Sequence, residues 1–377
     1  MTNKQERKLF IEQNVPKKLL DVFQDDNLHL VGGAVRDLLL GVHPKDLDFA
    51  IPLPVLDVKQ KLIKANIPHF NLGEKFGTLV AHMNGQNFEI TSLREEVAYK
   101  GRFPSVLFTN SFEKDAVRRD FTINALYISL DGELLDFFEG KKDLKTRTIK
   151  FIENPKERIL EDPLRILRFY RFWGQIEGVG ESESRKACSK HMELINTLSP
   201  ERIWAEFSKI LSHPTRYMIL KSLSDDHFLW DMKISEKLKI MEPLNPLTAL
   251  ASLNIKDLPC PFSNKDLNMV KKLKTLEGQY HYKTLLLEHE LDLIQELVIL
   301  NFLNGIHREE ELHSIKRELQ SMIIPLFPLR GEDLLPFVQG KELGETLKKT
   351  KDFWMESPET RDKEACLKFA LSSLQSI

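Results

Sequence analysis

The sequence predicts an α+β protein in which a head built on a mixed β-sheet is followed by an all-helical remainder. In residues 1–150, short apolar runs are separated by Gly, Pro and Asn, a pattern typical of strands joined by turns. Beyond residue 150, apolar side chains recur at helical spacing. The chain has 377 residues, more than one hydrophobic core usually serves, so we expect several domains.

The expected elements follow from these runs. The apolar runs predicted as strands are 29–31, 47–51, 78–82, 87–91 and 125–130. Helical stretches are predicted between them at 4–24, 34–40 and 54–65. Strands and helices alternate only in part, which favours a mixed sheet. After the head, the clearest helical segments are 155–173 and 200–211.

Composition excludes some classes of protein. Hydrophobic residues make up 42% of the chain and charged residues 29%, which is ordinary for a globular protein. The net charge of −2 argues against a uniformly basic nucleic-acid-binding surface, but not against a local one. Residues 141–171 carry ten Lys and Arg against five Asp and Glu. Such a segment is a solvated face about as often as it is a binding surface.

Localisation is predicted to be cytoplasmic. No run of about 18 apolar residues suggests a membrane-spanning helix, and the first residues lack the apolar segment of a secretory signal. The cysteines are isolated and show no zinc-binding spacing, so we expect reduced, buried thiols rather than disulfides. They are Cys188, Cys260 and Cys366.

A Gly-Gly pair before a helix forms the first candidate site. Gly32 and Gly33 end the strand 29–31, where backbone N–H groups without bulky side chains can approach a phosphate closely. Arg36, one turn into the helix, could add a charged hydrogen bond. A plain tight turn explains the glycines at least as often. No Gly-Lys-Ser/Thr follows, which excludes a P-loop.

Two aspartates on the next predicted strand form the second candidate site. Residues two apart on a strand point to the same side, so Asp46 and Asp48 should face one site. Two carboxylates that close repel unless a cation neutralises them, and oxygen ligands favour Mg²⁺. A solvated pair is the commoner explanation of such a spacing alone. Following the Gly-Gly turn, the pair favours a metal-dependent phosphoryl transfer site.

A third cluster, RRDFTINA, occupies 118–125. Arg119 is a candidate ligand for a triphosphate, and Asp120 and Asn124 could orient a sugar or a loop. The alternative is a solvated arginine pair.

The fourth cluster begins with EDPLR at 161–165. Asp162, Arg165, Arg168 and Arg171 recur every three residues and so form a stripe along a helix. Asp162 could instead cap the helix that starts at Pro163. A carboxylate beside a guanidinium matches cytosine and adenine, which each present an amino group next to a ring-nitrogen acceptor. Uracil and guanine present the reverse pattern, so this pair could select C and A without a template.

Taken in order, these clusters resemble the class II tRNA nucleotidyltransferases, the CCA-adding enzyme family. The matching segments are GGAVRD at 32–37, DLD at 46–48, RRDFTINA at 118–125 and EDPLR at 161–165. FEITSLR at 88–94, LDFFEG at 135–140 and SPERIWAE at 199–206 add to the match, which spans nearly the whole chain and is weakest between 215 and 325.

The resemblance implies a polymerase-β-like nucleotidyltransferase head at 1–150, a helical neck at 151–215, a body at 216–325 and a tRNA-gripping tail at 326–377. It implies CTP and ATP as substrates, the tRNA 3′ end and acceptor arm as partner, and two Mg²⁺ ions. The residue roles that it implies are metal binding for Asp46 and Asp48, triphosphate and sugar binding for Gly33, Arg36 and Arg119, base selection for Asp162 and Arg165, and an extension of that stripe for Arg168 and Arg171. Glu89 is a possible third carboxylate.

Other outcomes remain open from the sequence. The segment 95–106 departs from the family pattern at Lys100 and Phe103 while keeping Gly101 and Arg102. Because the family separates complete from partial addition in that loop, CC-only or A-only addition is an alternative. A poly(A) polymerase shares the head motifs, and a non-catalytic RNA-binding relative is a further possibility. The sequence leaves the oligomeric state and the switch from C to A undetermined.

Overall fold

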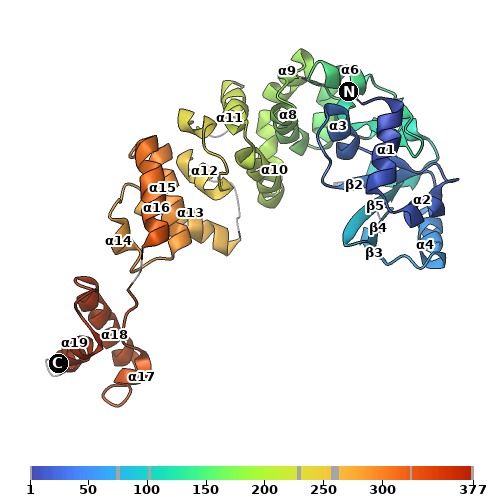
Figure 1. Cartoon of the computed structure of the whole chain (residues 1–377). Helices are drawn as coiled ribbons and strands as arrows, with labels where there is room; N and C mark the ends of the chain where they lie inside the picture. The colour runs from blue at the N-terminus through green and yellow to red at the C-terminus, as the bar shows by residue number, and fades with distance from the viewer. Residues whose placement is uncertain are drawn as a thin grey trace. The chain divides into compact units, whose positions relative to one another are not determined.

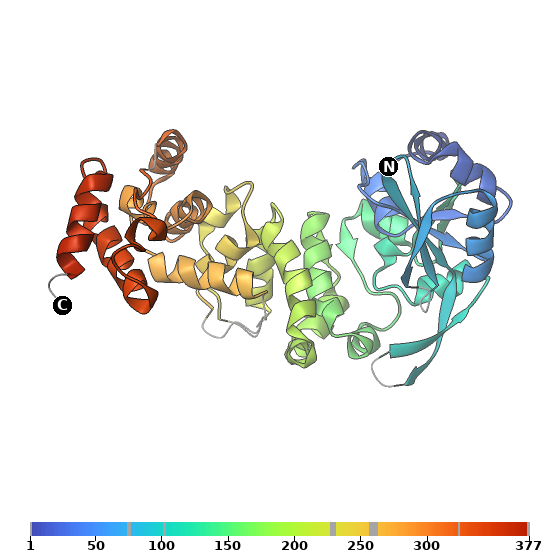
Figure 2. The same cartoon turned by 90° about the horizontal axis from the view of Figure 1, so that it is seen from below.

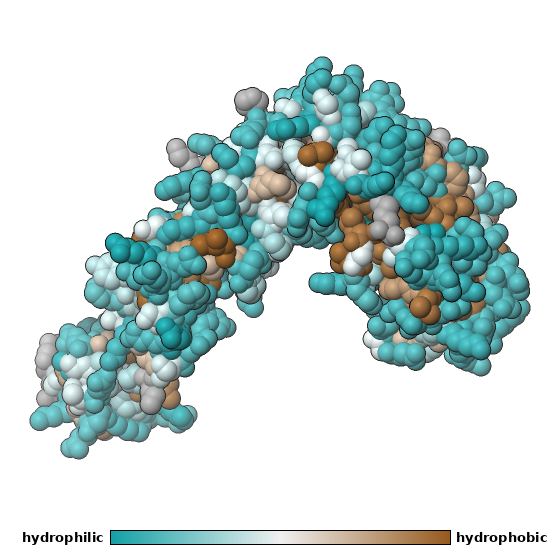
Figure 3. All heavy atoms as spheres, turned by 45° about the horizontal axis from the view of Figure 1, so that its top comes forward, coloured by the Kyte–Doolittle hydropathy of each residue, from teal (hydrophilic) through white to brown (hydrophobic). Residues whose placement is uncertain are grey.

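The computed structural model describes residues 2–73, 77–100, 103–226, 231–255, 263–322 and 325–374 (Figure 1). By their internal contacts the residues fall into two compact units, Met1–Asp231 and Met232–Ile377. Among the described residues, none of the helices combines the length and apolar character needed to cross a membrane. On the face drawn in Figure 3, hydrophilic residues predominate and hydrophobic residues gather in patches.

A seven-stranded mixed sheet organises the head. Its strand order is β3-β4-β5-β2-β1-β8-β9. Strands β2 and β5 are parallel, whereas every other neighbouring pair in this sheet is antiparallel. The mixed sheet predicted from the sequence is therefore confirmed. The strands are β1 (His29–Val31), β2 (Leu47–Ile51), β3 (His69–Gly73), β4 (Thr78–Met83), β5 (Gln86–Ser92), β8 (Leu126–Ser129) and β9 (Leu134–Asp136).

Helices lie beside this sheet, as Figure 2 shows. The predicted segment 4–24 is two helices, because Pro16 interrupts it. The first of them starts with a capping box in which Asn3 and Glu6 satisfy each other's backbone N–H groups. The helices of the head are α1 (Lys4–Asn14), α2 (Lys17–Phe23), α3 (Gly33–Leu40), α4 (Val55–Lys64), α5 (Phe112–Val117) and α6 (Gly140–Lys145).

A two-stranded antiparallel hairpin, separate from the main sheet, was not predicted. It consists of β6 (Arg94–Lys100) and β7 (Phe103–Phe108) and projects from the head in Figure 2. The loop in which the sequence departs from the family pattern falls on this hairpin. Gly101 and Arg102 lie outside the described residues.

The helical part of the first unit follows the head. β10 (Thr148–Ile149), at the end of the predicted head, pairs in parallel with β11 (Val179–Gly180), which is an exception to the predicted all-helical remainder. The segment 155–173 is two helices that meet at Asp162 and Pro163. The helices are α7 (Pro155–Glu161), α8 (Leu164–Gln175), α9 (Ser182–Lys190), α10 (Pro200–Ser212) and α11 (Arg216–Asp225).

The regular secondary structure described in the second unit is entirely helical. Its most apolar helix, α15, buries Leu297, Val298 and Leu300 in the core of this unit. The helices are α12 (Pro246–Ser252), α13 (Asn264–Leu276), α14 (Tyr282–Leu285), α15 (Leu291–Leu303), α16 (Glu309–Ser321), α17 (Gly331–Leu334), α18 (Gly340–Met355) and α19 (Lys363–Leu374).

The fold class predicted from the sequence is confirmed: a mixed-sheet head precedes helices. The contact-based division falls after Asp231, and the finer boundaries at 150, 215 and 325 remain predictions. Cys188 and Cys366 are free and buried as expected, and Cys260 lies outside the described residues.

Candidate active site

A cavity of about 440 Å³ in the first unit brings the sequence motifs together. The open face of the sheet, the end of α5 and one side of α8 contribute its walls. The predicted site residues that line it are Gly33, Arg36, Asp48, Arg119, Asp162, Arg165, Arg168 and Arg171. Glu89 and Arg118 line it as well, whereas Asp46 lines a neighbouring cavity.

Asp48 is close to two other carboxylates, those of Glu89 and Asp46. It lies on β2 directly opposite Glu89 of the parallel strand β5. Burial and the negative charges of Glu89 and Asp46 together raise the pKa of Asp48 to about 6, against the opposing effect of Arg119. Asp46 immediately precedes β2 and is exposed, so the prediction that both aspartates share a strand and one cavity holds only for Asp48.

The chemistry of these carboxylates suits a divalent cation. Three acidic groups near one another raise the cost of ionising Asp48, and a cation would remove that cost. Within the described part of the chain, no group of three or more Asp, Glu, His or Cys forms a ready-made metal cage. A carboxylate pair that shares its ion with substrate phosphates and water, as Mg²⁺ sites often do, is therefore the arrangement that fits.

The Gly-Gly turn is fixed by backbone geometry and by a close neighbour. Gly32 has φ of +68°, a conformation that side chains rarely adopt, and helix α3 begins after it. A Cβ atom on Gly32 would stand 3.4 Å from Nη1 of Arg119. Arg36 is buried, pairs with Asp37 at 2.7 Å and donates to Oδ1 of Asn124 at 3.1 Å. The helix N-terminus and the two arginines thus face the same cavity.

Asp115 holds both adjacent arginines, a role that the sequence interpretation missed. It is 1% exposed and accepts hydrogen bonds from Arg118 at 2.8 Å and Arg119 at 3.0 Å. Tyr127 donates to the same carboxylate at 2.8 Å. Burial disfavours the charge on Asp115, but the two guanidiniums outweigh it and its pKa lies below the usual value. The spacing of three and four residues, typical of one helix face, was the available signal.

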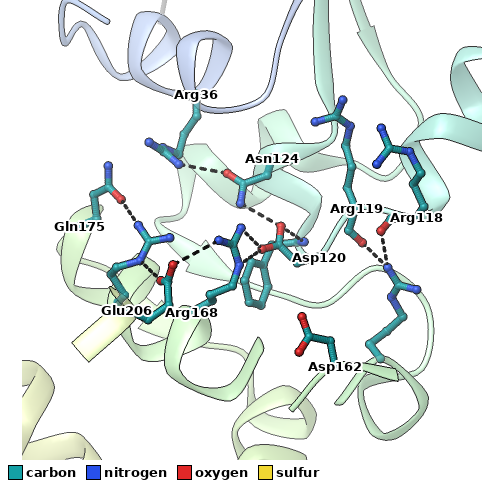
Figure 4. Close-up of polar contacts among 12 residues, drawn as sticks. Arg36, Arg118, Arg119, Asp120, Asn124, Asp162, Arg168, Gln175 and Glu206 are labelled. Atoms are coloured by element: carbon teal, nitrogen blue, oxygen red, sulfur yellow. Dashed lines mark hydrogen bonds and ion pairs between the residues drawn. The ribbon is translucent and has the colours of Figure 1, made fainter. Parts of the chain in front are cut away.

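A chain of polar contacts runs from the Gly-Gly turn to the stripe on α8 (Figure 4). Asn124 donates to Oδ1 of Asp120 at 3.0 Å, and Oδ2 of Asp120 pairs with Nη2 of Arg168 at 2.5 Å. Glu206 of α10 pairs with Arg168 at 3.6 Å and with Arg171 at 2.6 Å. Burial works against ionisation of Asp120, but Arg168 and Asn124 lower its pKa below the usual value. We call these residues, together with Arg36, the polar chain.

The aromatic ring of Phe172 packs against three arginines of the polar chain. The guanidinium carbons of Arg36, Arg168 and Arg171 lie 5.0, 5.3 and 4.0 Å from its centroid, within cation–π range. The buried carboxylates of Asp120 and Glu206 neutralise part of the positive charge of these arginines. Cation–π contact with Phe172 stabilises the remaining charge. The arginines are therefore held in defined positions along one wall of the cavity.

The two predicted base-reading residues have other partners in this structure. Both oxygens of Asp162 accept from Arg202 Nη2, at 3.0 and 2.9 Å, and Oδ1 also accepts from the backbone N–H of Leu164 at 3.2 Å. Asp162 thus accepts from the first N–H group of α8, but Pro163 occupies the N-cap position and α8 begins at Leu164, so the alternative interpretation of Asp162 as the N-cap is one residue out. Asp162 still lines the cavity. Arg165 pairs with Glu161 at 2.5 Å.

Arg158 is a second residue that the sequence interpretation missed. It is buried, and its Nη2 donates to the carbonyl oxygens of Arg118 at 2.7 Å and Arg119 at 2.6 Å. It also pairs with Glu161, the partner of Arg165. Helix α7 is thereby attached to the end of α5. Because both contacts are to backbone atoms, no side-chain pattern in the sequence signals them.

Comparison with known proteins identifies the family of this chain. A family model described as the poly A polymerase head domain matches residues 28–150, and one described as a probable RNA and SrmB-binding site of polymerase A matches 181–230. The mitochondrial CCA tRNA nucleotidyltransferase 1 of Mus musculus is 32% identical over 398 residues, covering 94% of this chain and 89% of that protein. This chain belongs to the CCA tRNA nucleotidyltransferase family.

Other members of the CCA tRNA nucleotidyltransferase family support this assignment. The mitochondrial enzyme of Danio rerio is 33% identical over 93% of this chain and 88% of its own. The CCA-adding enzyme of Lactobacillus johnsonii is 39% identical over 48% of this chain and 45% of its own. The resemblance inferred from the motifs is confirmed. The two relatives that match along nearly the whole chain are mitochondrial proteins. Cytoplasmic localisation therefore stays a prediction.

Solved structures of CCA-adding enzymes share the fold. The Bacillus stearothermophilus enzyme, determined in complex with CTP, superposes with a TM-score of 0.77 at 21% identity and covers 100% of this chain and 99% of its own. The Thermotoga maritima enzyme, determined with a tRNA, superposes with a TM-score of 0.63 at 23% identity, covering 98% of each chain. Nucleotidyltransferases of this family use divalent metals, which agrees with the carboxylates at the site.

Proposed function

We propose that this protein adds C, C and A in turn to the 3′ end of tRNA without a nucleic-acid template. CTP and ATP are the donors, and pyrophosphate is released at each step. The observation that carries the proposal is the single cavity in which Asp48, the Gly-Gly turn and the Asp162–Arg165 wall meet. The CCA-adding relatives that match along nearly the whole chain support it.

The transfer step requires a terminal hydroxyl, a phosphorus atom and a leaving group in line. The 3′ oxygen of the RNA forms a bond to the α-phosphorus, the bond from that phosphorus to the bridging oxygen breaks, and pyrophosphate leaves with the electron pair. The hydroxyl proton is released to solvent. Asp46 and Asp48 would hold two Mg²⁺ ions, which would supply charge neutralisation for the attacking and leaving oxygens.

The triphosphate would lie against the Gly-Gly turn. Backbone N–H groups at the start of α3 and the guanidiniums of Arg36 and Arg119 face the cavity there. Arg119 is held by Asp115 and Tyr127, so little side-chain entropy is lost when an anion binds. This preorganisation should strengthen the binding of the triphosphate, because Arg119 is already held in position.

Selection of C and A is assigned to Asp162 and Arg165. One carboxylate oxygen would accept from the exocyclic amino group and the guanidinium would donate to the ring nitrogen. Arg202 and Glu161 occupy these groups in the present structure, so base binding exchanges one set of charged hydrogen bonds for another. Exchange of that kind costs less than leaving either group unpaired.

Purified protein given tRNA that lacks its 3′ CCA should add C, C and A and then stop. Long adenosine tails would identify a poly(A) polymerase, and arrest after CC would identify a partial enzyme. No incorporation from CTP or ATP would refute the enzymatic function.

The selectivity assignment has its own test. Exchanging the charges with Asp162→Arg and Arg165→Asp should relax the preference for C and A over U and G, as measured by single-nucleotide incorporation. Arg202→Asp is a control that disturbs the same ion pair without changing the proposed base contacts. Unchanged selectivity in the double variant would refute the assignment.

A further inference from the structure

A basic cavity of about 520 Å³ lies in the first unit, apart from the active-site cavity. It is formed by α9, by β11 and by the residue that ends α11. The charged and hydroxyl-bearing residues that line it are Ser182, Arg185, Lys186, Ser189, Lys190 and Asp226. None of these six lines the active-site cavity, so the proposed nucleotide addition gives them no role.

The basic cavity lies behind the helix that carries the arginine stripe. Successive residues of a helix are turned by about 100°, so Tyr170 and Trp173 lie roughly opposite Arg168 around α8. The hydroxyl of Tyr170 donates to Oδ2 of Asp226 at 2.7 Å, and the ring centroid of Trp173 lies 5.1 Å from the guanidinium carbon of Arg185. Helix α8 therefore separates the basic cavity from the active-site cavity.

Arg185 is held in position while the end of its side chain stays available. Its Nε donates to Oδ2 of Asp226 at 2.7 Å, and its guanidinium lies over the ring of Trp173. In the part of the chain that the structure describes, its Nη1 and Nη2 have no hydrogen-bond partner. These two nitrogens form a fork that can donate to two oxygens of one phosphate. Because Arg185 is already fixed, little side-chain entropy would be lost on binding.

The charges in the wall favour an anion. Three cationic side chains and one carboxylate line the cavity, which leaves an excess of two positive charges. Lys186 and Lys190 are four residues apart on α9, so their like charges repel each other on one helix face unless an anion lies between them. Glu183 balances part of the charge of Lys186, at 2.9 Å, whereas Lys190 has no ion pair among the described residues. The hydroxyls of Ser182 and Ser189 are further possible donors to phosphate oxygens.

We propose that the basic cavity binds a small phosphorylated molecule, with a phosphate group held by Arg185, Lys186 and Lys190. Its volume lies within the range usual for small-molecule sites, about 300–1,000 Å³. Acidic residues border it, since Glu181 and Glu183 stand at the start of α9. A nucleic-acid backbone requires a continuous basic track, which these carboxylates interrupt. A small anion meets only the basic part of the wall.

Acylation of lysine side chains, read by mass spectrometry, tests the proposal on the full-length protein without CTP or ATP. No lysine among the described residues lines the active-site cavity, so an anion bound there leaves the signal unchanged. With pyrophosphate as the probe, acylation of Lys190 should slow at least about threefold, because its ammonium group is then engaged by the phosphate. Lys156, exposed on α7 and outside the cavity, should be acylated at an unchanged rate.

Substitution of the fixed arginine gives a second measurement. Arg185→Gln should abolish the protection of Lys190 by pyrophosphate. Arg147→Gln is the matched control, because it removes an equal charge from an exposed arginine that pairs with Glu177 outside the cavity, and it should leave the protection intact.

Four outcomes would overturn the proposal. The first is equal acylation of Lys190 with and without pyrophosphate, and the second is protection that persists in Arg185→Gln. The third is the same slowing by sodium chloride at matched ionic strength, which would be charge screening alone. The fourth is protection by tRNA lacking CCA but not by pyrophosphate, which would identify an RNA contact instead. Nucleotide addition takes no part in this assay, so the proposed function stands or falls separately.

Discussion

Asp120 connects the two ends of the polar chain, and its substitution by asparagine tests how much that chain contributes. Asn has nearly the same volume, but it replaces one acceptor oxygen with an amino group. Asp120 is 8% exposed and accepts from Arg168 at 2.7 Å, Asn124 at 3.0 Å and the backbone of Phe121 at 2.9 Å. In Asp120→Asn, Arg168 loses its carboxylate partner at residue 120 and keeps the longer contact to Glu206, at 3.6 Å, and the ring of Phe172.

The expected cost follows from burial. Removing one partner of a fully buried ion pair typically costs 3–5 kcal/mol, and a hydrogen bond to a charged group contributes about 1.5–3 kcal/mol. The side chain of Arg168 retains 30% exposure on the cavity side, so water replaces part of the lost interaction. We therefore expect Asp120→Asn to destabilise the first unit by about 2–4 kcal/mol. Because Arg168 lines the cavity, CTP affinity should fall as well.

Peptide-resolved hydrogen exchange is the suitable assay, because two compact units need not unfold in a single transition. Protection should fall in α8 and around Phe121, while α15 in the second unit is unchanged. The pKa of Asp120 is lowered in the folded state, so its contribution is present above the ordinary carboxyl pKa and is lost as pH falls through the folded value. The difference in the stability of the first unit between wild type and Asp120→Asn should therefore become smaller in acid.

Asp143→Asn is a matched control, since Asp143 accepts from Thr122 at 2.7 Å and does not line the cavity. Asp143→Asn should lower the stability of the first unit by about 1 kcal/mol and leave the affinity for CTP unchanged. The reasoning fails if Asp120→Asn changes stability by no more than this control, or if its effect is the same at all pH values.

Two further substitutions address the catalytic and structural roles separately. Asp48→Asn should slow single-turnover transfer by about a thousandfold, since a metal ligand supplies several kcal/mol at the transition state, with native stability retained; a rate within tenfold of wild type would exclude the proposed role. Arg158→Met should lower the stability of the first unit by about 2–3 kcal/mol in the same exchange assay, because the carbonyls of Arg118 and Arg119 lose their donor. Unaltered protection at the end of α5 would contradict this.

Local sequence patterns predicted the head strands, the Gly-Gly turn and most of the cavity wall. The runs at 29–31 and 47–51 match β1 and β2, because alternating or continuous apolar runs between turn formers are local signals. The two edge strands of the sheet, β3 and β9, and the hairpin of β6 and β7 were missed. The hairpin segment mixes Glu, Lys and Pro with apolar residues, and its pairing depends on contacts between strands.

Residues that act through long-range contacts could not be predicted from the sequence. Glu206 belongs to α10 and meets Arg168 and Arg171 across 35 or more positions of chain. The strand argument also placed Asp46 and Asp48 in one cavity, whereas the strand begins between them. A residue at a strand boundary has less fixed side-chain direction than one inside it.

The polar chain has an evolutionary consequence. Arg36, Asn124, Asp120, Arg168, Glu206 and Arg171 come from four separate segments of the chain, yet each contacts the next or shares the ring of Phe172. Substitutions at neighbouring members should show epistasis, because each one changes the charge that the next must balance. A change of nucleotide preference would then arise through paired replacements, and a library that varies one position at a time would record these positions as uniformly intolerant.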